Sequence, residues 1–109
     1  MDPGFINKIS ADLEHLKEYS AGMLLYGSHA TGKADERSDI DICIIAGPGQ
    51  DPMHSLSRAW QTVRSDIYDI RIFEQLPLHL QIRVLLSGIW LYHKDPAGLG
   101  EYLYPVWKR

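Results

Sequence analysis

The spacing of apolar residues along the chain alternates between the helical and the strand period. Over residues 5–19, apolar side chains recur every three or four positions between charged ones, which predicts an amphipathic helix that Gly22 ends. The same period predicts helices over 53–63 and from Pro77, which can begin a helix without losing a needed amide, to the stop signal at Gly88. The expected buried faces are, in order, Ile6, Ile9, Leu13 and Leu16; Met53, Leu56, Trp60 and Val63; and Leu78, Ile82, Leu85 and Leu86.

Short apolar runs separate these helices and predict four strands, over 23–26, 40–45, 67–73 and 89–92. A polar loop or short helix joins the first two strands, and a turn over 47–50 follows the second. Strands that alternate with helices are typical of α/β proteins. We therefore expect a small mixed β-sheet with helices packed on it.

Residues 1–109 are predicted to form a single domain, because the chain shows no linker or internal repeat and its length suits one compact core. In the tail, residues 95–109, Leu99 and Leu103 fall near helical spacing, although Pro105 is a poor helix former. Large aromatic side chains crowd the same tail: Tyr102, Tyr104 and Trp107. We expect a helix there whose aromatic residues form either the edge of the core or a surface for a partner.

Composition narrows the class of protein. An apolar fraction of 45% is that of an ordinary folded domain, and the net charge of -3 excludes an extensive nucleic-acid surface, which needs clustered Lys and Arg. The single cysteine, Cys43, lies in the apolar run 42–45 and is expected to be a buried thiol of a cytoplasmic protein. Residues 1–4 lack the pattern of a secretion signal, and no apolar stretch is long enough to cross a bilayer.

Two carboxylates, Asp39 and Asp41, stand at the start of the second strand. Side chains two residues apart in a strand project from the same face, about 6 to 7 Å apart, so the pair can share one metal site. Ile40 and Ile42 then point into the core. The alternative is an acidic pair that is merely exposed on the solvated face of a strand.

Gly27 and Ser28 directly follow the first strand, and ten residues separate them from the acidic pair. Glycine lets the backbone turn tightly and approach a ligand closely, and serine adds a hydroxyl and an amide donor. Such a corner suits a triphosphate. A plain turn capped by serine is the alternative, and it is favoured only if the acidic pair is ignored.

A third carboxylate is expected because two magnesium ions, about 3.5 to 4 Å apart, concentrate more charge than two carboxylates and a phosphate chain balance. Asp69, in the middle of the third strand, is the best candidate, since a carboxylate there is costly to bury unless it is ligated or paired. The alternative role of Asp69 is an ion pair with Arg71. Asp66 and Glu74, at the two ends of the same strand, are the substitutes if the register differs.

The combination resembles the DNA polymerase β nucleotidyltransferase superfamily and, within it, the minimal nucleotidyltransferases of prokaryotes. The matching segments are 25–28, Gly32, Ala34, 38–42, the strand around Asp69, Gly88 and 91–92, so the resemblance covers nearly the whole chain. It implies the small mixed sheet of the polymerase β palm and a nucleotidyltransferase activity.

The resemblance also implies a mechanism. Asp39 and Asp41 bind two Mg²⁺ ions, and Asp69 binds the catalytic one and helps to activate the acceptor hydroxyl. The acceptor oxygen attacks the α-phosphorus of a nucleoside triphosphate, and pyrophosphate leaves. The residues that the resemblance assigns to the β and γ phosphates are Gly27, Ser28 and Ser38.

The loop after Gly27 departs from the family pattern, because relatives often carry arginines where this chain has His29 and Thr31. Phosphate contacts there are expected to be weaker. Lys33 or Arg37 is the candidate for the missing positive charge, although each is more often a solvated side chain in such a loop.

The family also suggests the acceptor. Minimal nucleotidyltransferases commonly act as antitoxins that add AMP from ATP to a tyrosine of a HEPN-type ribonuclease toxin, so a HEPN-type protein is the expected partner. A non-catalytic module that neutralises its partner by contact is the alternative, and transfer to a small acceptor such as an aminoglycoside is a third possibility. Neither the base of the nucleotide nor a homo-oligomeric state follows from the sequence.

Overall fold

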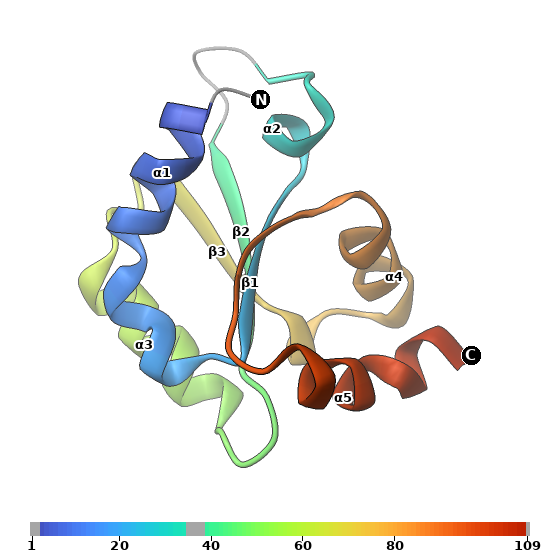
Figure 1. The fold of residues 1–109 in the computed structure, drawn as a ribbon. Coiled ribbons are helices and arrows are strands. Elements are labelled where there is room, and N and C mark those ends of the chain that lie inside the picture. The colour runs from blue at the N-terminus through green and yellow to red at the C-terminus, as the bar shows by residue number, and fades with distance from the viewer. Residues whose placement is uncertain (1–2, 35–38, 109) are drawn as a thin grey trace.

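The computed structural model describes residues 3–34 and 39–108, and its centre is one four-stranded sheet (Figure 1). The strands lie in the order β3-β2-β1-β4, with β1 antiparallel to both of its neighbours and β2 parallel to β3. Their bounds are β1 Gly22–Tyr26, β2 Ile40–Ile45, β3 Tyr68–Ile72 and β4 Ile89–His93. The mixed sheet confirms the predicted fold class, and all four strands lie where the apolar runs predicted them.

Helices cover both faces of the sheet. Figure 1 shows α1 and α3 on one face and α4 and α5 on the other, with the short helix α2 beyond the end of β1. The helical elements are α1 Pro3–Asp12, the 3₁₀ helix η1 Glu14–Tyr19, α2 Ser28–Thr31, α3 Pro52–Thr62, the 3₁₀ turn η2 Phe73–Gln75, α4 Leu78–Ser87 and α5 Pro96–Lys108. No helix in the described parts of the chain is both long and apolar enough to span a bilayer.

The two faces of the sheet carry separate hydrophobic cores, because successive residues of a strand point to opposite sides. Leu25 and Ile42 pack with the helices α1 and α3, whereas Leu24 and Cys43 pack with α4 and α5. A strand buried on both faces has no polar side to show. This explains why the two central strands, β1 and β2, appear in the sequence as largely apolar runs.

The predicted helix over 5–19 is wrong in its second half. The α-helix ends at Asp12, and Leu13 has φ -104° and ψ 3°, after which η1 continues to Tyr19. In a 3₁₀ helix, residues three apart lie directly above one another, so the tighter winding points both Leu13 and Leu16 into the core. Gly22 does not end this helix but is the first residue of β1.

Two helices bury only some of the residues that the apolar spacing predicted: Leu56 on α3 is buried as expected, but others are not. Trp60 on α3 is 64% exposed and Met53 is also exposed, whereas Ser55 is buried and donates its hydroxyl hydrogen bond to the Tyr19 carbonyl at 2.7 Å. On α4, Leu86 is 71% exposed. Spacing alone cannot tell which part of a wide apolar stripe meets the sheet.

Glu74 ties α5 to the end of the sheet opposite the acidic residues. Its carboxylate accepts hydrogen bonds from the Ala46 and Gly47 amides at 3.0 and 2.9 Å and from the Tyr102 hydroxyl at 2.7 Å. Burial, and then the hydrogen bond to Glu74, raises the pKa of Tyr102. The glutamate therefore joins the β2–α3 turn, the end of β3 and the last helix.

We expect Tyr102→Phe to lower the free energy of unfolding by about 1.5 to 3 kcal/mol, because it removes a hydrogen bond to a charged group. Chemical denaturation would measure the loss. Tyr104→Phe on the exposed side of the same helix is the control, and an equal loss in both variants would contradict the role assigned to the Glu74 hydrogen bond.

Candidate active site

The parallel pairing of β2 with β3 brings two carboxylates together. Asp41 and Asp69 are direct register partners, so both side chains project from the same face of the sheet, with their strands about 4.8 Å apart. Asp39 is exposed and lies one residue ahead of β2. The three candidate acids therefore lie at the same end of the sheet.

The electrostatics of Asp41 show that these acids interact. Burial raises the pKa of its carboxyl group, and the neighbouring charges of Asp69 and then Asp39 raise it further. His29 and Arg71 oppose this rise. Asp41 is thus the central, half-buried member of the acidic group.

Tyr26 is a neighbour of the acidic pair that was not among the predicted site residues. It lies opposite Asp41 in the β1–β2 register, and its pKa is raised by burial and then by the surrounding anions, including Asp41 and Asp69. The signal available in the sequence was its position directly before Gly27. Its location on the acidic face required the register.

Gly27 lies against the carboxylate of Asp41. Its φ is 72° and its ψ is -152°, a combination that essentially only glycine adopts. A Cβ built on Gly27 would overlap Oδ2 of Asp41. Glycine is therefore required both by the backbone conformation and by the close approach of a functional side chain.

The loop residues that differ from the family pattern make local contacts. The hydroxyl of Thr31 lies 3.3 Å from the Gly27 carbonyl and 3.4 Å from the Ser28 carbonyl, as a donor to its own turn. The ring of His29 stacks on Phe5 of α1, with 5.3 Å between the ring centroids. Lys33 is exposed, and the two remaining candidates in this loop, Arg37 and Ser38, lie outside the described residues.

The two substitutes for Asp69 are placed elsewhere. Asp66 lies in the turn before β3 and pairs with Arg64 at 2.6 Å, and Glu74 lies beyond the far end of β3. Asp69 also forms the ion pair that was its alternative explanation, because the Nε atom of Arg71 lies 3.4 Å from its Oδ1. An exposed pair at this distance is weak and leaves Asp69 accessible to a stronger ligand.

The donor set fits a hard divalent cation. Carboxylate oxygens are the ligands that Mg²⁺ prefers, and Asp41 and Asp69 present them from adjacent strands with Asp39 beside them. Across residues 3–34 and 39–108, however, no three His, Cys, Asp or Glu side chains are already arranged as a metal-binding group. Asp69 is turned towards Arg71, so this acid needs to move before the three carboxylates converge.

Two cavities, of about 340 and 180 Å³, adjoin the acidic group along the edge strand β3. Both are lined by Asp69 and by the exposed ring of Trp60, and the smaller one also reaches Asp39. Trp60 was expected in the core, so its place beside Asp69 appears only in the structure. The cavities therefore place open space beside Asp69 and Asp39 at the edge of the sheet.

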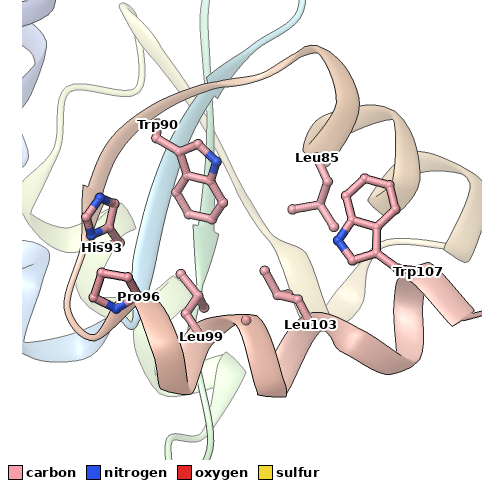
Figure 2. Close-up of a pocket in the computed structure, with 8 residues that line it drawn as sticks. Leu85, Trp90, His93, Pro96, Leu99, Leu103 and Trp107 are labelled. Atoms are coloured by element: carbon pink, nitrogen blue, oxygen red, sulfur yellow. The ribbon is translucent and has the colours of Figure 1, made fainter.

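A further pocket, of about 440 Å³, lies between β4, α4 and α5 (Figure 2). Figure 2 shows Leu99 and Leu103 of α5 beneath it, with Trp90 and Leu85 above and Trp107 at one side. None of the acidic residues lines it. It is larger but mainly apolar, and it offers no carboxylate for phosphate-transfer chemistry, so the acidic end of the sheet is the candidate active site.

Known proteins resemble both the sequence and the fold. The family described as "Polymerase beta, Nucleotidyltransferase" matches residues 7–97. A predicted protein adenylyltransferase of Methanocaldococcus jannaschii is 32% identical over 90 residues, which cover 80% of this chain and 69% of the relative.

Among solved structures, a toxin-antitoxin complex with AMP-PNP matches with a TM-score of 0.65 at 20% identity, covering 94% of this chain and 84% of the other. A complex of a tri-AMPylated HEPN toxin with its MNT antitoxin from Shewanella oneidensis matches with a TM-score of 0.57 at 18% identity, covering 94% and 82%. At these identities the structures establish the fold. The family match over residues 7–97 and the M. jannaschii relative show that this chain belongs to the polymerase β nucleotidyltransferase family.

Proposed function

We propose that this protein is a Mg²⁺-dependent protein adenylyltransferase, which moves AMP from ATP to a tyrosine hydroxyl of a HEPN-type toxin in the cytoplasm and releases pyrophosphate. The observation that carries the proposal is the register pairing of Asp41 with Asp69, with Gly27 closed against Asp41. The M. jannaschii relative, named for the same activity, supports the choice of a protein acceptor.

Asp39, Asp41 and Asp69 would hold two Mg²⁺ ions. When bound, these ions supply positive charge that stabilises the attacking and departing oxygens and balances the triphosphate. Gly27, Ser28 and Ser38 would hold the β and γ phosphates, through the backbone amides of the turn and the two serine hydroxyl groups.

Asp69 would orient the acceptor and accept its proton, since it is 41% exposed on an edge strand and the other two acids are farther from that edge. An acceptor on a folded partner can reach a site that opens at the rim of a sheet. The exposed ring of Trp60 beside Asp69 would form part of the surface that such a partner contacts.

A second function, neutralisation of a partner by contact alone, is favoured by the Asp69–Arg71 ion pair, which gives Asp69 a role without a metal. We propose that residues 1–109 act as a single domain in either case. The exposed aromatic residues of α5, Tyr104 and Trp107, would then contribute to the partner surface.

Labelling with α-³²P-ATP separates the two functions. The protein would be mixed with Mg²⁺ and a co-purified HEPN-type partner, and compared with Asp39→Ala/Asp41→Ala. We expect label on the partner that EDTA abolishes and that falls at least about a hundredfold in the double variant, the effect of losing charge-stabilising groups.

Equal labelling by the double variant would contradict the proposed mechanism. Protection of cells from the toxin without any label, in both proteins, would favour the contact-only function. Repeating the reaction with each of the four ribonucleoside triphosphates would test the preference for ATP, and an unlabelled partner alongside a labelled small acceptor would reject the protein-acceptor part of the proposal.

A further inference from the structure

We propose that Arg71 is a built-in counter-ion for the Asp41–Asp69 pair, which keeps a free divalent cation out of the site until a nucleoside triphosphate brings the cation with it. This inference rests on the proposed function, because it concerns the loading of the same site. The inference gives a role to the Arg71 guanidinium, a positive group in an acidic site, which has no part in the proposed transfer mechanism.

The strand geometry places Arg71 beside both carboxylates. It follows Asp69 by two residues on β3 and therefore projects from the same face, and its register partner Cys43 follows Asp41 by two residues on β2. The Nε atom lies 3.4 Å from Oδ1 of Asp69. The guanidinium thus stands at the edge of the space that a cation bound to the two acids would share.

The charges of this group act on one another. The hydrogen bond and the charge of Asp69 raise the pKa of Arg71, and the charges of Tyr26 and Asp41 raise it further. In return, burial, Asp69 and Asp39 raise the pKa of Asp41, and the guanidinium opposes this rise after the larger effect of His29. Arg71 therefore pairs directly with Asp69 and also contributes positive charge near Asp41.

The strength of the pair suits a displaceable counter-ion. The Arg71 side chain is 59% exposed, and exposed ion pairs contribute only about 0 to 1 kcal/mol. A free divalent cation is repelled by the guanidinium and also has to separate it from Asp69. The complex of a divalent cation with a nucleoside triphosphate has a net negative charge, so Arg71 attracts it.

The freed guanidinium then has a second partner. Arginine binds phosphate oxygens through a planar fork of donors, and the loop residues His29 and Thr31 are engaged with Phe5 and with their own turn. Arg71 can thus supply to the triphosphate the positive charge that this loop lacks. Its release from Asp69 and its contact with phosphate would be one coupled movement.

Mn²⁺ binding without nucleotide tests the inference apart from catalysis. Free Mn²⁺ would be titrated by electron paramagnetic resonance against the metal-free wild type, Arg71→Gln and Arg64→Gln. Arg64→Gln is a matched control, since Arg64 forms another Arg–Asp pair at a two-residue spacing and its replacement changes the net charge by the same amount. We expect Arg71→Gln to bind Mn²⁺ about tenfold more tightly and Arg64→Gln to change the affinity less than about twofold.

Adding AMP-PNP would test the second part. We expect the nucleotide to improve Mn²⁺ binding by wild type much more than by Arg71→Gln, and the Mn²⁺·AMP-PNP complex to bind Arg71→Gln more weakly than wild type. Arg71→Lys, which keeps the charge, should retain weak binding of free Mn²⁺. Adding Asp69→Asn to Arg71→Gln should remove the gain in Mn²⁺ affinity, because the gain depends on Mn²⁺ binding to the Asp69 carboxylate.

The same Mn²⁺ affinity in wild type and Arg71→Gln, or an equal gain in Arg64→Gln, would overturn the inference. Circular dichroism would verify that each variant is folded, as expected for exposed arginines. The labelling experiment tests the proposed function separately. If Arg71→Gln does not change Mn²⁺ affinity, the inference fails but the proposed AMP transfer still stands. If no AMP is transferred, the proposed enzyme activity is rejected whatever the Mn²⁺ titration gives.

Discussion

Asp41→Asn is expected to abolish AMP transfer and, in the same molecule, to make the fold more stable. Transfer should fall at least about a hundredfold, because the substitution removes the central charge of the site while keeping the size of the side chain. Stability should rise because the ionised carboxylate is less favourable in the folded protein than in the unfolded chain. The raised pKa of Asp41, caused by burial and then by Asp69 and Asp39, carries this argument.

The pH dependence gives the sign of the effect. A carboxyl group whose pKa is raised in the folded protein stabilises the fold while it is protonated. This contribution to the free energy of unfolding is fully present below the ordinary pKa of 3.8 and is lost as the pH rises through the pKa of the folded protein. Asparagine does not titrate, so the stability gain of the variant should be seen at neutral pH and disappear at acid pH. Thermal unfolding in EDTA at several pH values would measure it.

Asp66→Asn is the matched control, since the hydrogen bond from Arg64 lowers the pKa of Asp66 and its carboxylate is exposed. That variant should keep transfer and show no gain in stability. A loss of both transfer and stability in Asp41→Asn would instead mean that Asp41 serves the fold and not the chemistry.

Gly27→Ala is expected to cost both stability and activity. The backbone conformation at Gly27, with φ 72°, costs a residue with a Cβ about 1 to 3 kcal/mol, and the added methyl group would also displace the Asp41 carboxylate. The free energy of unfolding should fall by at least this amount, and transfer should fall by at least about a hundredfold as Asp41 moves. Chemical denaturation and the labelling assay would measure the two losses.

Gly32 provides the comparison, because it also has a positive φ, 75°, but has nothing within 4 Å of an added Cβ. Gly32→Ala should cost about 1 kcal/mol, the penalty of the left-handed conformation, and leave transfer near the wild-type rate. Equal loss of activity in the two variants would show that turn strain, and not the approach to Asp41, is what matters at Gly27.

Much of the fold was predictable because buried strands and amphipathic helices require apolar residues at characteristic spacings. The four apolar runs became the four strands, and Pro77 and Gly88 bounded α4 as expected. The prediction over 5–19 was wrong because helical spacing does not distinguish an α-helix from an α-helix that tightens into a 3₁₀ turn. Side-chain burial on α3 and α4 depended on which part of each apolar stripe meets the sheet.

The candidate residues of the site came from local spacing, and their arrangement came from pairing between strands. Gly27 and Asp41 are close in sequence, and their contact follows from the antiparallel β1–β2 pairing. Asp69 lies 28 residues beyond Asp41, and no local pattern specifies the register of two strands that are joined by a helix. A shift of one residue would have turned Asp69 to the opposite face.

The sequence by itself determined the family, the mixed α/β class and the acids available for chemistry, because these depend on composition, periodicity and short motifs. Only the tertiary structure decided that Asp69, and not Asp66 or Glu74, stands beside Asp41, that Tyr26 and Trp60 border the site, and that Arg71 already occupies its edge. The physical reason is that charge interactions and close contacts depend on distances across strands. Residues far apart in the chain acquire those distances only when the sheet forms.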